Sequence, residues 1–287
     1  MTERIVFMKA GVSVIIAAWN AAATIGETIQ SALNQTHAPL EVLVCDDGSS
    51  DNTREIIEAF NDARVRWIDG ERRSGRPAVP RNRGIAQSAG EWIAMLDSDD
   101  QWLPEKLAAQ LALAEKLDCR AVSTNAVRFV PAKGAAGNLL SWSKERITFN
   151  DLLDINQVVC SSALIHRSVF KIARGFPEAP GLKSIEDYAC WLRAATQTDF
   201  AYLAEPLVIY RDDPVNSVRS ADVTLLSQRR LVFKDFLEWT TAQKQSDKVI
   251  EGFERQVKRE LQRDYWRRHA GNIRRIKQKI KSLAAFK

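Results

Sequence analysis

Three stretches decide the fold: VSVIIAAWN at residues 12–20, VLVCDDGSSD at residues 42–51 and WIAMLDSDD at residues 92–100. Each begins with an apolar run, broken only by Ser13 in the first, which is typical of a strand buried on both faces of a parallel sheet. Each ends abruptly in polar or acidic residues. Since the carboxyl ends of parallel strands meet at one edge, where ligands bind in such sheets, we expect these polar ends to share a site.

Helical patterns separate these strands. Thr24 with Glu27 has the spacing of a capping box, and Asn52 with Glu55 marks a second helix start. The pattern predicts strands over residues 12–17, 40–45, 64–68, 92–96 and 121–127, with a short helix over 82–89 and a helix from Pro104 to about Leu117. Alternation of this kind predicts a right-handed, parallel α/β sheet.

The pattern is looser after residue 130. It predicts a loop over residues 131–143, a strand over 161–166, a helix over 186–198, a strand over 207–211 and basic helical structure from residue 221 onward. The 287 residues suffice for one large α/β domain, or for a domain of roughly 200 residues with a smaller appendage.

Composition excludes several classes of protein. Hydrophobic residues make up 45% and charged residues 27% of the chain, as in ordinary globular proteins. The four cysteines form no CxxC pair, which favours reduced, buried thiols. Glu3 and the β-branched run after Val12 disfavour a secretory signal, and no apolar run reaches the ~18 residues of a membrane span. We therefore expect a cytoplasmic protein.

The C-terminal segment is strongly basic. Nine Lys or Arg residues and a single acid, Asp264, lie between Arg263 and Lys287. Ile273, Ile276, Ile280 and Leu283 form an amphipathic stripe. Two interpretations stay open: the helix contacts an anionic membrane surface, or it packs its stripe on the body of the protein. Nucleic-acid binding has no accompanying recognition motif, and we expect none.

Three acidic segments carry candidate chemistry. The three carboxylates of Asp97–Asp100 favour a divalent cation, or else cap the following helix. The segment Asp46–Asp51 can accept hydrogen bonds from a nucleobase or ribose, or simply form an Asx-rich turn. Asp187 beside Glu186 can act as a general base, or as helix N-terminal acidity.

Together, the ordered motifs at residues 13–20, 46–51, 97–100 and 186–191 resemble family 2 glycosyltransferases with the GT-A fold. The resemblance covers about residues 11–215. It implies a Rossmann-like nucleotide-diphospho-sugar transferase fold with a mostly parallel central sheet. Residues 1–220 would form this domain, with 11–128 as the nucleotide-sugar-binding half and 129–220 as the acceptor-binding half. Residues 221–287 would form a helical, basic C-terminal extension.

The resemblance also implies roles for single residues. Asp187 would be the catalytic base, and Asp97 and Asp99 would hold Mn²⁺ or Mg²⁺. The nucleotide-sugar donor would contact Ala17, Trp19, Asp46, Asp47, Arg81, Arg83 and Asp97. Trp19 would stack on the base and Asp47 would bind it, while the two arginines would neutralise phosphate. A mobile, solvated basic loop is an equal alternative for the arginines near residues 72–83.

Some positions depart from the family pattern. Ala18 stands where a proline is common, and no histidine follows Tyr210–Asp213, so the third metal ligand is open. The QxxRW signature of processive synthases is absent, which favours one sugar per catalytic event.

The resemblance implies an inverting transferase that moves a sugar, from a UDP-sugar by default, to a saccharide or lipid-linked acceptor. Bacterial surface polysaccharide or lipopolysaccharide synthesis is the expected pathway, with the basic helix as a candidate contact to the inner face of the membrane. The alternatives are a sugar-phosphate nucleotidyltransferase and a non-catalytic nucleotide-sugar-binding protein.

Overall fold

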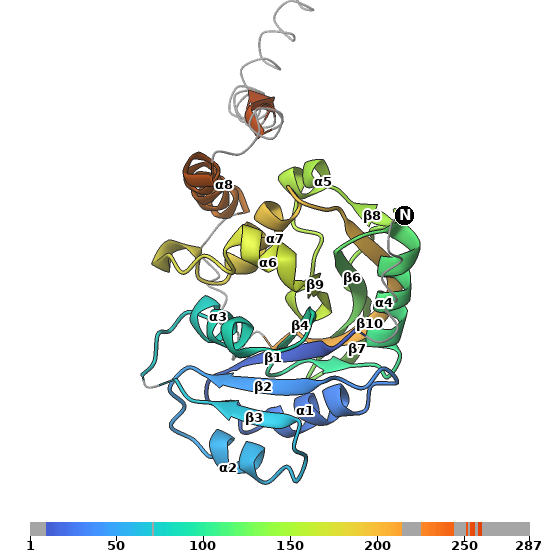
Figure 1. The fold of residues 1–287 in the computed structure, drawn as a ribbon, viewed down its shortest axis with the longest axis vertical. Coiled ribbons are helices and arrows are strands. Elements are labelled where there is room, and N and C mark those ends of the chain that lie inside the picture. Colours follow the sequence, from blue (N-terminus) through green and yellow to red (C-terminus); the bar gives the residue numbers. More distant parts are fainter. Residues whose placement is uncertain are drawn as a thin grey trace, which may run out of the picture. The chain divides into compact units, whose positions relative to one another are not determined.

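The computed structural model describes residues 10–70, 72–213 and 225–243, together with residues 251, 253–255 and 258–259. The chain divides into two compact units, residues 1–239 and residues 240–287. Everything below concerns the first unit (Figure 1). The basic segment 263–287 lies outside the described residues, so its two interpretations stay predictions. The domain boundary predicted at residue 220 also stays a prediction.

Four parallel strands form the first half of the sheet, in the order β3-β2-β1-β4. They are β1 (Val12–Ala18), β2 (Glu41–Asp46), β3 (Val65–Ile68) and β4 (Trp92–Asp97). Ala17 pairs in register with Cys45 on one side and with Asp97 on the other. The polar ends of these strands therefore meet at one edge of the sheet, as predicted.

The second half of the sheet is mixed. β9 (Leu164–His166) runs antiparallel between β4 and β6 (Ala121–Val130), and β10 (Phe200–Arg211) runs parallel to β6. Three short strands complete it: β5 (Gln101–Trp102) and β8 (Arg146–Ile147) pair with β10, and β7 (Gly134–Asn138) pairs with β6. The sheet is thus mostly parallel along its long strands, but not wholly parallel.

Helices cover both faces of the sheet. α1 (Ile25–Leu33) and α4 (Lys106–Leu117) share one core with β1, β2 and β4, and α2 (Thr53–Glu58) adds Ile57 to it. α3 (Ala78–Gln87) covers the other face. A Cβ at Gly84 would lie 2.6 Å from the Cys45 sulfur and 2.7 Å from a methyl of Ile15, so glycine lets α3 lie directly on β1 and β2.

The remaining helices lie in the second half of the chain (Figure 1). They are α5 (Phe149–Asp154), α6 (Arg167–Ala173), α7 (Glu186–Ala194) and α8 (Leu225–Gln243), with 3₁₀ turns at Cys160–Ser162 and Pro180–Leu182. α7 is anchored from two sides. The Tyr188 hydroxyl donates to the Leu152 carbonyl, and Arg193 pairs with Asp235 of α8 at 2.7 Å.

Several local predictions were wrong. The helix predicted over residues 82–89 spans 78–87, the loop predicted over 131–143 contains β7, and the strand predicted over 161–166 begins with a 3₁₀ turn. The helix predicted over residues 186–198 ends at Ala194, and the strand predicted over 207–211 begins earlier, at Phe200. Thr24 makes no capping box, because its hydroxyl donates to the Ser98 carbonyl at 2.8 Å. Tertiary hydrogen bonds outcompeted the local pattern here.

Within the described residues, no helix is both long enough and apolar enough to cross a membrane.

Candidate functional site

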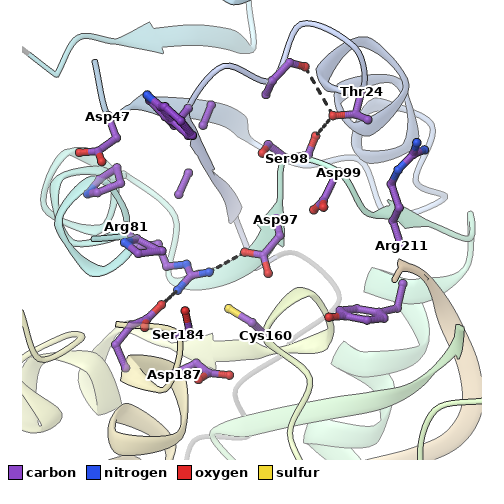
Figure 2. A pocket seen from close by; sticks show the side chains of 18 of the residues that line it. Thr24, Asp47, Arg81, Asp97, Ser98, Asp99, Cys160, Ser184, Asp187 and Arg211 are labelled. Carbon is purple, nitrogen blue, oxygen red and sulfur yellow. Dashed lines mark hydrogen bonds and ion pairs between the residues drawn. The ribbon is translucent and has the colours of Figure 1, made fainter. Parts of the chain in front are cut away.

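A pocket of about 800 Å³ opens at the carboxyl edge of β1 and β4. Its walls include the ends of β1, β2, β4 and β10, α3 with its preceding loop, the 3₁₀ turn at Cys160 and the start of α7. Figure 2 shows Arg81 and Asp97 near its centre, with Ser98 and Asp99 on one side and Ser184 and Asp187 on the other. This is the edge where the acidic motifs were expected to meet.

The Asp46–Asp51 turn is locked by its own side chains. Asp46 is buried, and its carboxylate accepts hydrogen bonds from the Gly48 and Ser49 amides, the first at 2.7 Å. Gly48 has φ +78°, a conformation that favours glycine. The Asn20 side chain accepts from the Ser50 amide at 2.8 Å. Asp46 therefore holds the turn together and is not among the residues that line the pocket.

Asp47 fastens the loop before α3 to the pocket. Its carboxylate accepts hydrogen bonds from the Ser74 amide at 2.9 Å, the Ser74 hydroxyl at 2.6 Å and the Gly75 amide at 2.8 Å. The neighbouring Arg73 guanidinium stacks over the Trp19 indole at 3.5 Å, and Trp19 is 41% exposed. The loop thus covers the two side chains expected to contact the base.

The stretch Arg81–Gly84 of α3 connects distant parts of the site. Arg81 is buried and donates to Asp97 and to Glu186, each at 2.6 Å. Asn82 exchanges hydrogen bonds with the main chain of Phe176. Arg83 donates to the Asp46 carbonyl at 2.7 Å and does not line the pocket. Both arginines expected to meet phosphate are therefore engaged by protein groups.

The three carboxylates after β4 have different surroundings. Asp97 is half-buried against Arg81. Asp100 is buried and accepts from the Ser161 hydroxyl at 2.5 Å and the Arg211 amide at 2.8 Å, so it joins β4 to β10. Loss of water around Asp99, followed by the Asp97 charge, raises the pKa of Asp99 to about 6. Only Asp99 and the remaining oxygen of Asp97 are thus available to a ligand.

Asp187 lies at the start of α7 and lines the pocket. Burial, and then the adjacent Glu186 charge, raise the pKa of Asp187 to about 7, while Arg81 opposes the shift. A carboxyl group with such a pKa can accept and release a proton near neutral pH, which suits a general base. Ser184, just before this helix, has φ +69°, and such backbone strain occurs often at functional sites.

The acidic residues fit a divalent cation that is shared with a substrate. The Asp99 carboxylate lines the pocket and accepts a hydrogen bond from its own amide. Arg81 binds one oxygen of Asp97, which leaves the other oxygen for a ligand. The described part of the chain contains no cluster of three or more metal-ligating side chains. Mg²⁺ and Mn²⁺ commonly bind one or two carboxylates and take further oxygens from substrate phosphates. The site therefore fits a cation that binds together with a diphosphate.

Most predicted site residues meet in this pocket: Ala17, Trp19, Asp47, Arg81, Asp97, Asp99 and Asp187. Asp46 and Arg83 lie behind its wall. The sequence did not assign Glu186, Cys160 or Arg211 to the site, although all three line the pocket. Glu186 was noticed as the neighbour of Asp187 in its motif, but no role was assigned to it. Cys160 gave no signal, because an apolar run surrounds it.

Comparison with known proteins identifies the family. Residues 13–172, more than half of the chain, match the family model described as glycosyl transferase family 2. The chain belongs to this family. It is therefore a glycosyltransferase, and the GT-A fold predicted from the motifs is confirmed. The family decides against the nucleotidyltransferase and the non-catalytic binding protein.

Relatives and solved structures agree with this assignment. TuaG of Bacillus subtilis, named for teichuronic acid biosynthesis, is 29% identical over 80% of this chain and 91% of its own length. The Escherichia coli UDP-Glc:alpha-D-GlcNAc-diphosphoundecaprenol beta-1,3-glucosyltransferase WfgD is 34% identical over 63% of this chain and 68% of its own. TarS of S. aureus, solved with UDP, shares the fold with a TM-score of 0.60 at 22% identity, over 80% of this chain and 70% of TarS.

Proposed function

We propose that this family 2 glycosyltransferase moves one sugar, with inversion, from a UDP-sugar to the hydroxyl of a lipid-linked or saccharide acceptor in bacterial surface polysaccharide assembly. The observation that carries the proposal is that Asp99 and Asp187 line one pocket, and each has a raised pKa. The names of TuaG and WfgD support the pathway and the acceptor class. The structure of TarS with UDP supports the donor.

Each part of the pocket has a task in this proposal. Ala17, Trp19 and Asp47 bind the nucleoside, and Asp97 and Asp99 would hold Mn²⁺ or Mg²⁺. A bound divalent cation would compensate the charge that builds up on the leaving diphosphate. The loop over Asp47 and Trp19 shields the donor from water, which would otherwise hydrolyse it. Arg76 of this loop donates to the Glu178 carbonyl, so the loop contacts both halves of the domain.

The chemical step is a single displacement. The acceptor oxygen attacks the anomeric carbon, its proton passes to Asp187, and the bond between the anomeric carbon and the phosphate oxygen breaks with its electron pair on the nucleoside diphosphate. No second carboxylate is assigned as a nucleophile, so the anomeric configuration inverts. The Asp187 carboxylate must be ionised to accept the proton. Turnover therefore rises with pH through the pKa of Asp187, about 7.

The test is a panel of UDP-sugars and other nucleotide-sugars with Mn²⁺, scored for release of the nucleoside diphosphate. We expect one donor to release UDP in the wild type. Asp99→Ala should lower that release about 10²-fold, whereas Asp69→Ala, which changes an exposed acid after β3, should not. Full activity of Asp99→Ala, or activity without any divalent cation, would contradict the metal role. Absence of both donor binding and release would contradict the donor class, and NMR of the product's anomeric proton checks inversion.

A further inference from the structure

Glu186 is a buried carboxylate to which neither the family motifs nor the proposed mechanism assigns a task. One of its oxygens accepts from Arg81 at 2.6 Å. Its other oxygen is buried and makes no hydrogen bond within the described part of the chain. An incompletely satisfied buried carboxylate costs stability, so its presence beside Asp187 calls for a functional reason.

Arg81 is fixed firmly enough to act as an anchor for Glu186. Gly84 seats α3 on the sheet, Arg83 binds the Asp46 carbonyl, and Asn82 binds the main chain of Phe176. The Arg81 guanidinium also lies 5.3 Å from the Phe176 ring. Its two hydrogen bonds therefore join a rigid helix to the end of β4 and to the first residue of α7.

The geometry of a helix links Glu186 to its neighbour. Successive residues of an α-helix point about 100° apart. Once Glu186 is held toward α3, Asp187 must point in a different direction, and it lines the pocket (Figure 2). The first turn of a helix otherwise frays easily, because its amides have no partners within the helix.

We propose that Glu186 and Arg81 are positioning residues for the transfer step: Arg81 holds Glu186 against α3, which aims Asp187 into the pocket and keeps the Glu186 charge beside it. The inference rests on the proposed role of Asp187 as base. It gives Arg81 a task that differs from phosphate binding, since both of its hydrogen-bonded partners are carboxylates of the protein.

The charged and titratable groups around Asp187 come from several elements, and the two thiols among them are neutral because burial raises their pKa values. Glu186 and Cys190 lie on α7 itself, Arg81 faces it from α3, Asp97 from the end of β4, and Cys160 from its 3₁₀ turn. After burial, Glu186 is the largest cause that raises the pKa of Asp187. Removing the Glu186 charge should therefore lower that pKa, because a neighbouring like charge disfavours ionisation.

Three variants separate position from charge. Glu186→Gln keeps an oxygen that accepts from Arg81 but removes the charge, Glu186→Ala removes both, and Glu205→Gln is the control, because Glu205 is exposed on β10. We expect Glu186→Gln to retain most of the maximal kcat while the acid limb of its kcat–pH profile moves down by roughly 0.5–1 pH unit. Glu186→Ala should lose kcat by about 10²-fold with little change in donor KM. An unmoved acid limb in Glu186→Gln, or equal kcat in Glu186→Ala, would overturn the proposal.

A second measurement does not depend on activity. The raised pKa of Asp187 means that the folded protein loses stability as pH rises from about 4 through about 7. The difference in Tm between the wild type and Asp187→Asn, measured as a function of pH, reports the contribution of Asp187 to this loss of stability. In the Glu186→Gln background the same difference should develop at lower pH. If the Tm difference developed at the same pH in the wild-type and Glu186→Gln backgrounds, the proposed effect of the Glu186 charge on Asp187 would be contradicted, even if no donor turned over. An inactive wild type with a shifted midpoint would instead count against the proposed function.

Discussion

Asp47 and Asp187 line the same pocket, yet the protein surrounds them in opposite ways. Three donors from the loop before α3 bind the Asp47 carboxylate. Asp187 lies in a cluster with Glu186 and Asp97, where Arg81 pairs with the other two carboxylates. At the donor end, each acid accepts several hydrogen bonds and holds structure together. At the α7 end, negative charge exceeds the donors available, and the pKa of Asp187 rises to about 7.

This difference separates acids that build the site from acids that can react. Asp46 and Asp100 belong with Asp47, since each accepts hydrogen bonds that fasten one segment to another. Asp99 belongs with Asp187, since loss of water and a neighbouring acid raise its pKa to about 6. A carboxylate with few hydrogen-bond donors binds protons and cations more strongly than one with several. The comparison can be broken at three places.

The largest effect is expected at Asp187. Asp187→Asn removes the proton acceptor but keeps the size of the side chain, so kcat should fall about 10²–10⁴-fold, the usual contribution of a general base. Donor affinity should stay within about twofold, because the base contacts the acceptor. Initial rates and calorimetric titration with UDP measure the two quantities. Asp69→Asn, at an exposed position, serves as control. Unchanged turnover in Asp187→Asn would show that Asp187 is not the general base.

An intermediate effect is expected at Asp47. Asp47→Asn places an amide NH₂ where one of the loop's donors now finds an oxygen, and an unmade buried hydrogen bond costs about 1–3 kcal/mol. We expect faster amide exchange in residues 72–77, measured by hydrogen–deuterium exchange with mass spectrometry. The exchange of α1 and the Tm should change little. If exchange in the loop stayed at the wild-type rate, Asp47 would not be holding it.

The smallest effect is expected at Arg73, whose guanidinium covers the face of Trp19. Arg73→Ala removes a stacking contact of about 0.5–1 kcal/mol at an exposed site, so UDP should bind roughly two- to fivefold more tightly if the arginine occupies the place of the base. Arg72→Ala is the matched control on the same loop. Calorimetric titration of both variants with UDP shows whether the affinity rises or falls. Weaker binding by Arg73→Ala alone would mean that the loop completes the donor site rather than covering it.

The sequence located the site well and described its contacts less well. The buried strands before Trp19, Asp46 and Asp97 were predicted because each is a local apolar run, and their common edge follows from parallel pairing. The strand that contains β9 was predicted, but its antiparallel pairing was not. β5 and β8 were missed because they have two residues each, too few for a periodic signal. Arg81 and Arg83 were recognised as site residues, but their partners were not.

The sequence alone determined the strand–helix alternation, the edge at which the acidic motifs meet and the family resemblance, because each depends on residues that are close in the chain. Only the tertiary structure decided which acids accept several hydrogen bonds and which accept few. Arg81 reaches Glu186 across 105 positions, and Arg211 reaches Asp100 across 111. The raised pKa values of Asp99 and Asp187 also depend on how fully the surrounding protein excludes water. Burial and the choice of partners follow from packing between distant segments, which no local pattern encodes.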